Sequence, residues 1–252
     1  MLAIERRNAI LSKLYIDGKV IVSELSTEFD VTEETIRRDL EKLDKEGLVK
    51  KTYGGAVPVQ NFSTDLPHTI RKKANVEAKQ KIAEKISRVF NDGDCIMIDA
   101  SSTAQMVLNF IKHLKNITII TNSVEGLIEL SDKEDWHIYS TGGKLKKSSL
   151  SLVGPSAQRL IRGYHVDYAV CSSKGIDIAN GITDSNEKDS EMKQAMFDSA
   201  QTKILVIDSS KFDKTSLIKV SDVSNVDIIA TDSEPSANWE EYLKSKNVEL
   251  IY

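Results

Sequence analysis

The sequence predicts two unequal domains: a small helical N-terminal domain that ends in a β-hairpin, and a larger C-terminal α/β domain built on a mostly parallel sheet. Three amphipathic helical patterns precede a Gly-Gly turn within residues 1–57. Beyond residue 75, short apolar runs alternate with amphipathic helical patterns. The length of 252 residues exceeds that of one small module, which agrees with two separate patterns.

The composition is that of an ordinary soluble globular protein, with 40% hydrophobic and 29% charged residues. No apolar run approaches the ~18 residues that a membrane span needs, and residues 1–17 lack the apolar centre of a signal peptide. We therefore expect a cytoplasmic protein. Cys95 and Cys171 lie in separate apolar runs without a CxxC or Cys/His pair, so we expect buried reduced thiols, no metal site and no cofactor.

The N-terminal domain begins with two predicted helices. The first covers residues 4–16, where apolar side chains recur at helical spacing, and Asp17-Gly18 ends it. The second covers residues 23–29, where Leu25 and Phe29 lie one turn apart.

A third helix is predicted over residues 33–46, with Thr32 as its N-cap. Its apolar stripe consists of Ile36, Leu40 and Leu43. Gly47 ends the helix, and the following segment LVKKTYGGAV predicts two short strands around a Gly-Gly turn. Three helices followed by a hairpin form a winged helix-turn-helix over residues 1–57.

Residues 58–75 carry two prolines, polar residues and a basic cluster, and we expect them to form a linker. In the remaining segment, 76–252, sequence patterns typical of helices alternate with patterns typical of strands. Helices are expected at 76–90, 103–114, 124–131, 155–161 and 187–200, and strands at 95–99, 118–121, 136–141, 167–172, 203–208 and, as the final strand, 227–231. Short continuous apolar strands between helices predict a mostly parallel sheet covered on both faces, with ligands bound at the carboxyl ends of its strands.

The third helix has the features of a DNA recognition helix. Its exposed face carries two adjacent arginines one turn from its start, where such helices enter the major groove. Adjacent helical residues point about 100° apart, so we expect one arginine at base edges and the other at phosphate, and the sequence leaves their assignment open. The expected DNA-binding residues are Thr32, Thr35, Arg37, Arg38, Lys42, Lys50 and Lys51.

A solvated helix face with i, i+4 ion pairs is the alternative for the segment RRDLEKLDKE. Charge does not separate the two interpretations, because residues 1–57 carry ten Lys and Arg against eleven Asp and Glu, and the whole chain has a net charge of −4. The order of the parts favours DNA binding, since a capped helix with paired arginines is followed by a hairpin that carries Lys50 and Lys51.

Small polar residues follow three predicted strands of the C-terminal domain, in the segments IDASSTAQ, TNS and TGGK. Such residues at strand-to-helix turns bind anions, although each segment alone is typical of ordinary helix caps and turns. Lysines after later strands could neutralise a phosphate. The expected ligand-binding residues are Asp99, Ser101, Ser102, Thr103, Thr121, Asn122, Ser123, Gly142, Gly143, Lys174, Gly175, Glu191 and Lys211.

The segment VSELSTEFDVTEETIRRDLEKLDKEGLVKKTYGGA resembles the N-terminal signature of the DeoR family of bacterial transcriptional regulators, and the resemblance continues over nearly the whole chain. It implies a C-terminal domain similar to sugar-phosphate isomerases, such as ribose 5-phosphate isomerase, and a phosphorylated sugar as effector. It also implies a repressor of a sugar-catabolism operon. Ala100 to Ser102 depart from the family's DxGTT-like motif, and Lys174 stands where many members have a small or polar residue, so the identity of the sugar stays open.

Two other functions agree with parts of the sequence. The first is a phosphosugar isomerase, in which Asp99, Asp184 and Glu191 could act as acid or base. Such an enzyme has no need of an N-terminal DNA-binding domain. A DNA-binding protein with a vestigial sensor would bind no phosphosugar. We expect a regulator without catalytic residues that binds operator DNA as a homodimer or homotetramer, because one such module buries too little surface for specific affinity.

Overall fold

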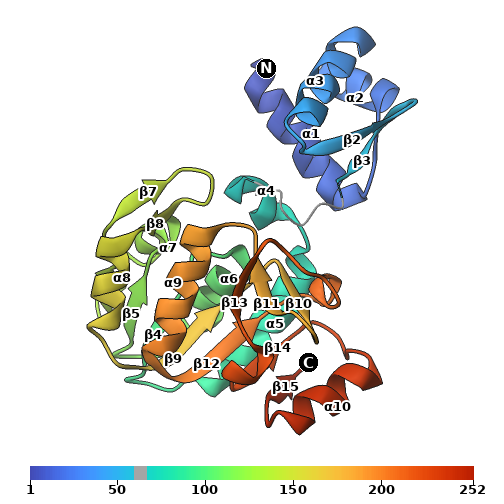
Figure 1. Ribbon diagram of the computed structural model, residues 1–252. Helices are drawn as coiled ribbons and strands as arrows, with labels where there is room; N and C mark the ends of the chain where they lie inside the picture. Colours follow the sequence, from blue (N-terminus) through green and yellow to red (C-terminus); the bar gives the residue numbers. More distant parts are fainter. Residues whose placement is uncertain (60–66) are drawn as a thin grey trace. The chain divides into compact units, whose positions relative to one another are not determined.

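The computed structural model describes residues 1–59 and 67–252 (Figure 1). The chain divides into two compact units, Met1–Asn75 and Val76–Tyr252.

The N-terminal unit is a winged helix-turn-helix, as predicted. Its helices are α1 (Ala3–Asp17), α2 (Val22–Phe29) and α3 (Glu33–Lys45), and its strands are β1 (Val20–Ile21), β2 (Val49–Thr52) and β3 (Gly55–Pro58). The strands pair antiparallel in the order β1-β3-β2, so the β2–β3 hairpin is the wing. Strand β1 was not predicted, because two residues are too few to show an alternating pattern.

The helical boundaries follow from local chemistry. The hydroxyl of Thr32 accepts a hydrogen bond from the backbone N–H of Thr35 at 3.3 Å, which caps α3. Gly47 has φ +70°, the left-handed conformation that favours glycine where a helix ends. The predicted stripe Ile36, Leu40 and Leu43 is at most 1% exposed and forms the core with Leu25 of α2.

Part of the expected linker is helical. Residues 68–73 form α4 (His68–Lys73), whose Ile70 is 1% exposed and belongs to the core of the N-terminal unit. Residues 60–66 of the expected linker lie outside the described residues. The expectation of a linker over the whole of 58–75 is therefore wrong for residues 68–73. The burial of Ile70 stabilises this helix, and the local composition does not reveal that burial.

The C-terminal unit is built on a parallel sheet of seven strands in the order β15-β14-β12-β9-β4-β5-β6. These strands are β4 (Cys95–Ile98), β5 (Thr118–Thr121), β6 (His137–Ser140), β9 (Val166–Cys171), β12 (Ala200–Val206), β14 (Ile228–Ala230) and β15 (Glu249–Ile251). Its helices are α5 (Val76–Ile86), α6 (Ser102–Phe110), α7 (Val124–Glu129), α8 (Pro155–Arg162), α9 (Glu187–Asp198) and α10 (Ala237–Ser245). The predicted mostly parallel α/β architecture is confirmed.

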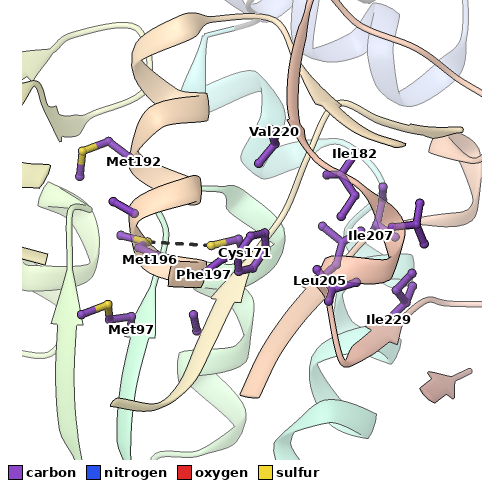
Figure 2. Packing of buried hydrophobic residues seen from close by; sticks show 14 of the residues in the cluster. Met97, Cys171, Ile182, Met192, Met196, Phe197, Leu205, Ile207, Val220 and Ile229 are labelled. Carbon is purple, nitrogen blue, oxygen red and sulfur yellow. Dashed lines mark hydrogen bonds between the residues drawn. The ribbon is translucent and has the colours of Figure 1, made fainter. Parts of the chain in front are cut away.

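Apolar side chains cover both faces of this sheet. One core contains Ile96 and Ile98 of β4 with residues of α5 and α6. The other contains Met97 of β4 and Cys171 of β9 with residues of α8, α9 and α10 (Figure 2). Alternate strand residues thus enter different cores, which explains why the strands appear in the sequence as continuous apolar runs.

Several elements were not predicted. Strands β7 (Lys144–Lys146) and β8 (Ser151–Val153) form a small antiparallel pair, and β10 (Gly175–Asp177), β11 (Gly181–Asp184) and β13 (Ile218–Ser221) form an antiparallel sheet. The expectation that the strand at 227–231 is the final one is wrong, because α10 and β15 follow it and β15 pairs with β14. These segments are short and mostly polar, so their apolar periodicity is weak.

Among the described residues, no helix has the length and apolar character that crossing a membrane requires.

Candidate functional site

The order of the parallel strands reverses between β4 and β9. Strands β5 and β6 lie on one side of β4, whereas β9, β12, β14 and β15 lie on the other. Open α/β sheets bind ligands at the carboxyl ends of the strands at such a switch point. Asp99 follows β4 and Ser172 follows β9, and the backbone N–H of Ser172 donates to Asp99 Oδ2 at 3.4 Å.

Asp99 organises the turn between β4 and α6. Its Oδ1 accepts hydrogen bonds from the backbone N–H of Ser101 at 3.0 Å and from the Ser101 hydroxyl at 2.5 Å. The Ser101 hydroxyl also accepts from the N–H of Ala104 at 3.2 Å and so caps α6. The hydroxyl of Ser101 therefore has a structural role, while Ser102 and the buried Thr103 form the first turn of the helix.

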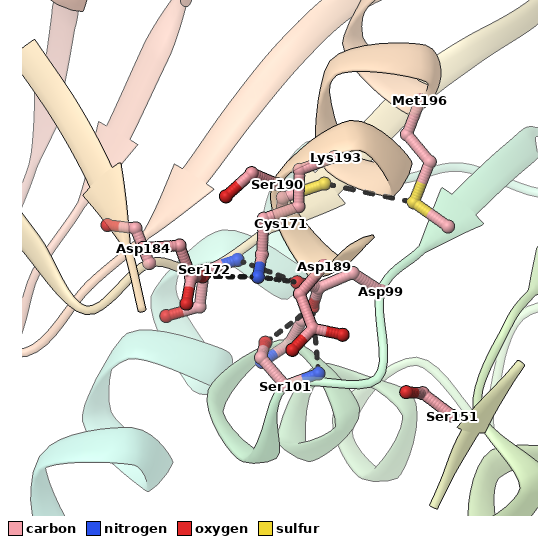
Figure 3. A network of polar contacts seen from close by, with 12 residues as sticks. Asp99, Ser101, Ser151, Cys171, Ser172, Asp184, Asp189, Ser190, Lys193 and Met196 are labelled. Atoms are coloured by element: carbon pink, nitrogen blue, oxygen red, sulfur yellow. Dashed lines mark hydrogen bonds and ion pairs between the residues drawn. The ribbon is translucent and has the colours of Figure 1, made fainter. Parts of the chain in front are cut away.

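A buried lysine joins Asp99 to a second carboxylate (Figure 3). Lys193 of α9 places its Nζ 2.5 Å from Asp184 Oδ2 and 3.6 Å from Asp99 Oδ2. The three side chains are at most 10% exposed. We call Asp99, Asp184 and Lys193 the sensor triad.

The sensor triad holds two carboxylates against one ammonium. Burial raises the pKa of Asp99 above its usual value, although Lys193 and the hydrogen bonds of Ser101 act in the opposite direction. Burial alone would also raise the pKa of Asp184, but the adjacent Lys193 ammonium holds it below its usual value. The two carboxylates in turn raise the pKa of Lys193 despite its burial, so this lysine is charged.

Buried polar atoms without a protein partner lie beside the triad and directly after β5. The hydroxyls of Ser172 and Ser185 neither donate nor accept a hydrogen bond within the described protein, and the same holds for Asn122 Oδ1. Ser172 lies beside Asp99, and Ser185 follows Asp184 directly. Buried polar groups are almost always hydrogen-bonded, so these atoms point to a polar partner from outside the chain.

Other expected ligand-binding residues have structural roles within the protein. The Thr121 hydroxyl donates to the carbonyl of Ile98 at 2.7 Å, and the Ser123 hydroxyl caps α7 by accepting from the N–H of Gly126 at 3.0 Å. Asn122 donates to the carbonyl of Leu152 at 3.2 Å. Gly142 and Gly143 have φ +59° and +101°, and a Cβ on Gly143 would lie 2.8 Å from the carbonyl oxygen of Val153.

The remaining expected ligand-binding residues come from the second half of the C-terminal unit and lie on several elements. The backbone N–H of Lys174 donates to the carbonyl of Thr183 at 3.0 Å, which places Lys174 at the β10–β11 hairpin. Gly175 is buried in β10, where a Cβ would lie 2.2 Å from the carbonyl oxygen of Lys214. Glu191 accepts from Gln158 at 2.8 Å, and Lys211 Nζ lies 3.3 Å from Asp208 Oδ2.

Lys193 and Ser172 are not among the expected ligand-binding residues, and Asp184 was expected only as an acid or base of the alternative isomerase. A signal for Lys193 exists, because it lies on the buried side of α9 between Met192 and Met196. A lysine among apolar residues of a helix is rarely buried without a partner. Its partner Asp99 follows β4 and its partner Asp184 ends β11, and no local pattern in the sequence joins these segments.

The expected DNA-binding residues lie mostly on the exposed surface of the N-terminal unit. Arg37 and Arg38 pair with Glu33 and Glu34 at 2.5 and 3.1 Å, and their side chains are 55% and 77% exposed. The hydroxyls of Thr32 and Thr35 lie 3.0 Å apart in the cap of α3. Lys42, Lys50 and Lys51 are exposed, and Lys51 Nζ lies 3.6 Å from Glu41 Oε1 of α3.

A buried ion cluster holds α3 against α1. Asp39 of α3 accepts from Arg6 Nε at 2.6 Å and from Arg7 Nη1 at 3.3 Å. Asp39 is 5% exposed and Arg6 8%. We call these three residues the helix clamp, because they fix the inner face of α3 while its outer face remains exposed.

Two domain-family models match consecutive parts of the chain. The model of the DeoR-like helix-turn-helix domain matches residues 6–61, and the model of the DeoR C-terminal sensor domain matches residues 74–233. Among solved structures, ribose 5-phosphate isomerase A of Methanocaldococcus jannaschii has a TM-score of 0.41 and 16% sequence identity, with 55% of each chain covered.

Three curated relatives match nearly the whole chain. An uncharacterized HTH-type transcriptional regulator of Bacillus subtilis, YulB, is 38% identical over 99% of this chain and 96% of its own length. The L-fucose operon activator of Haemophilus influenzae is 33% identical over 98% of both chains. The glycerol-3-phosphate regulon repressor of Escherichia coli is 28% identical over 98% of this chain and 97% of its own.

The names of these relatives are those of transcriptional regulators and not of enzymes. Both parts of the family architecture, the DNA-binding domain and the sensor domain, are matched in their expected order. The chain is therefore a transcriptional regulator of the DeoR family.

Proposed function

We propose that this regulator represses a sugar-catabolism operon and that a phosphorylated sugar, bound at the carboxyl ends of the parallel strands, controls its binding to DNA. The observation that carries the proposal is the sensor triad at the switch point of the sheet, together with the buried hydroxyls of Ser172 and Ser185. The names of two relatives refer to L-fucose and to glycerol 3-phosphate, compounds that carry several hydroxyls or a phosphate.

The charge of the triad suggests which end of the effector it binds. Two carboxylates and one ammonium leave the triad with one surplus negative charge, which repels a phosphate. The carboxylate oxygens can accept hydrogen bonds from sugar hydroxyls. We therefore assign the sugar hydroxyls to Asp99, Asp184 and Lys193. For the phosphate we propose the first turn of α6, where Ser102 and Thr103 lie at the positive end of the helix.

The other expected residues complete this proposed site. Asn122 has a buried oxygen without a protein partner, and the turns at Ser123 and at Gly142–Gly143 follow neighbouring strands. Lys174 and Lys211 supply positive charge close to Asp184 and Asp208, respectively. Thr121, Gly175 and Glu191 support the proposed site through the contacts described above.

We assign DNA binding to the outer face of α3 and to the wing. One of Arg37 and Arg38 contacts base edges and the other contacts phosphate, with Lys42, Lys50 and Lys51 as further phosphate contacts. Thr32 and Thr35 lie at the start of α3, where a recognition helix approaches the groove most closely.

The test has a binding arm and a response arm. Phosphorylated and neutral sugars are compared in thermal unfolding of the full chain, where a ligand at 100 times its Kd adds about 2.7 kcal/mol of stability. The effective ligand is then added to a complex with a duplex selected from a random pool by the wild-type protein. Release of the duplex supports the proposal, and a panel without any stabilising phosphosugar contradicts it.

Lys211 offers a matched pair of variants for the response arm. Lys211→Ala removes an i, i+3 partner of Asp208, whereas Lys219→Ala removes the exposed i, i+3 partner of Asp222 at 2.7 Å. We expect the Lys211 variant to bind the duplex normally and to retain it when the phosphosugar is added. The Lys219 variant should release the duplex like wild type. An unchanged response of the Lys211 variant removes this residue from the site.

We also propose that the protein binds DNA as a homodimer or homotetramer, because paired modules match repeated half-sites. Sedimentation of the free protein and of its complex with the selected duplex tests this. A monomer in both samples would refute it.

A further inference from the structure

The wing carries an aromatic side chain that the DNA-binding assignment above does not use. Tyr53 lies in the turn between β2 and β3 and has a relative exposure of 110%. The next most exposed large hydrophobic residues of the described chain, Met1 and Leu217, reach 71%. The ring and the hydroxyl of Tyr53 are therefore both accessible to a partner outside the chain.

The turn that presents Tyr53 is fixed to the body of the N-terminal unit. The carbonyl of Gly54 accepts a hydrogen bond from the N–H of Val22 at 2.9 Å. Gly55 pairs with Ile21 of β1, and a Cβ on Gly55 would lie 1.8 Å from the carbonyl oxygen of Val20. Only glycine permits this close approach, which holds the wing against β1. The ring is thus presented from a rigid support, which lowers the entropy lost on binding.

The strand that leads to Tyr53 runs beside α3. The backbone N–H of Lys51 donates to Asp44 Oδ1 at 2.9 Å, and Lys51 Nζ lies 3.6 Å from Glu41 Oε1. Both acceptors belong to α3, whose exposed face carries Arg38 and Lys42. Lys51, two residues before Tyr53, therefore connects the wing to the proposed recognition helix. Lys50, Lys51 and Tyr53 are all exposed. In Figure 1 the hairpin tip extends past the helices of this unit.

We propose that Tyr53 contacts the sugar-phosphate backbone of the bound duplex, with its ring against a deoxyribose and its hydroxyl donating to a phosphate oxygen. The proposal rests on the proposed function, since it requires α3 and the wing to engage one duplex. Tyrosine is among the side chains that bind phosphate, and such contacts position a protein without reading sequence. The neighbouring Lys50 and Lys51 favour a polyanionic partner over an apolar protein surface.

A tyrosine contact carries no charge, so the salt dependence of DNA binding distinguishes the role of Tyr53 from those of the neighbouring lysines. Loss of a lysine–phosphate contact lowers the slope of log Kd against log salt by about one, whereas loss of a neutral contact leaves the slope unchanged. A backbone contact also weakens binding to selected and scrambled duplexes by the same factor, while a base contact affects the selected duplex alone.

The experiment titrates the full chain against a selected duplex and a scrambled duplex at several salt concentrations. We expect Tyr53→Ala to weaken binding to both by about tenfold, and Tyr53→Phe by about threefold, as loss of one hydrogen bond predicts. Lys51→Ala should lower the salt slope, and Tyr53→Ala should not. Tyr252→Ala, which removes a 44% exposed tyrosine at the end of the other unit, is the matched control and should bind like wild type.

A photo-crosslinking amino acid in place of Tyr53 should attach to the duplex, and one in place of Tyr252 should not. Wild-type affinity of Tyr53→Ala on both duplexes would overturn the proposal, as would a loss confined to the selected duplex. In the same titration, Arg38→Ala tests the recognition helix independently. If Arg38→Ala weakens binding and Tyr53→Ala does not, DNA recognition by α3 stands and only the role of Tyr53 falls.

Discussion

Each unit of the molecule buries a cluster of three charged side chains, and the two clusters have opposite surplus charge. The helix clamp of the N-terminal unit sets Arg6 and Arg7 against Asp39. The sensor triad of the C-terminal unit sets Asp99 and Asp184 against Lys193. Within the described residues, every buried side-chain oxygen or nitrogen that lacks a hydrogen-bond partner lies in the C-terminal unit.

This difference separates a structural joint from the proposed binding site. In the helix clamp both oxygens of Asp39 have an arginine partner, so the cluster is complete without a ligand. Around the sensor triad, the hydroxyls of Ser172 and Ser185 have no protein partner, and burial raises the pKa of Asp99. A site that must bind a polar molecule has to keep hydrogen-bonding capacity that folding alone does not satisfy.

The largest effect on stability is expected from Lys193→Met. The substitution leaves two buried carboxylates without their ammonium, and breaking a buried ion cluster costs about 3 to 5 kcal/mol. Trp136 and Trp239, the two tryptophans of the chain, both lie in the C-terminal unit, so their fluorescence during denaturant unfolding reports on this unit.

The control for Lys193→Met is Lys112→Met. Lys112 pairs with Glu129 at 2.9 Å, but the two side chains are 39% and 26% exposed, so the loss should stay below about 1 kcal/mol. Equal stability of the two variants would show that the triad is not a buried charge cluster in solution.

Asp39→Ala is expected to cost less, about 2 to 3 kcal/mol, because the side chain of Arg7 is 17% exposed and can turn toward solvent. Since Asp39 lies on the inner face of α3, its loss should also weaken duplex binding. Amide hydrogen exchange of α3 measures the first effect, and titration with the selected duplex measures the second. Glu28→Ala, which removes an exposed partner of Lys13, should leave both unchanged. Wild-type exchange of α3 in the Asp39 variant would contradict the clamp.

The two carboxylates of the sensor triad should respond to pH in opposite directions. The lowered pKa of Asp184 contributes stability that is present above the ordinary value of about 3.9 and lost as the pH falls through the lowered pKa. The raised pKa of Asp99 makes the folded state bind more protons than the unfolded state, so its contribution decreases as the pH rises from about 3.9 through the raised pKa.

Carbon-13 NMR of the aspartate carboxyls measures both values, with Asp99→Asn and Asp184→Asn for assignment. We expect Asp99 to titrate above about 3.9 and Asp184 below it. A bound phosphosugar whose hydroxyls donate to Asp99 should lower the pKa of that residue, because hydrogen bonds to the charged form favour it. Titration of Asp99 below the ordinary value in the free protein would remove the distinction between the carboxylates.

The sequence predicted the elements that depend on interactions between residues close together in the chain. The cap at Thr32, the apolar stripe of α3 and the continuous apolar strands β4, β5 and β9 each follow from neighbouring residues. From these, the winged helix-turn-helix, the parallel sheet and the binding edge could be inferred. Asp99 was selected because it ends a strand.

The parts that were missed depend on distant segments. Lys193 and Asp184 meet Asp99 only after β4, β9, β11 and α9 have assembled, and the hairpin β10–β11 becomes a sheet by pairing with β13. Ser101, Thr121 and Ser123 were expected to offer free hydroxyls, yet the fold uses them to cap helices and join strands. Residue type and position at a strand end therefore do not show which hydroxyls the fold itself uses for hydrogen bonds.

The smallest effect on stability is expected from Arg38→Ala, and this variant separates folding from function most sharply. Arg38 is 77% exposed and pairs with Glu34 one turn away, a kind of contact that contributes at most about 0.5 kcal/mol. Its removal should leave the free energy of unfolding almost unchanged. On the selected duplex, however, Arg38→Ala should cost about 1 to 3 kcal/mol of binding free energy if Arg38 is the arginine that contacts base edges.

Arg37→Ala provides the comparison, because Arg37 pairs with Glu33 in the same i, i+4 arrangement. Titrations on the selected duplex, on single-base variants and at several salt concentrations distinguish the two arginines. The one at base edges should lose discrimination between bases, and the one at phosphate should lose affinity uniformly with a lower salt slope. If neither variant changes duplex binding, the outer face of α3 is only a solvated surface, and the helix clamp then fixes a helix that does not read DNA.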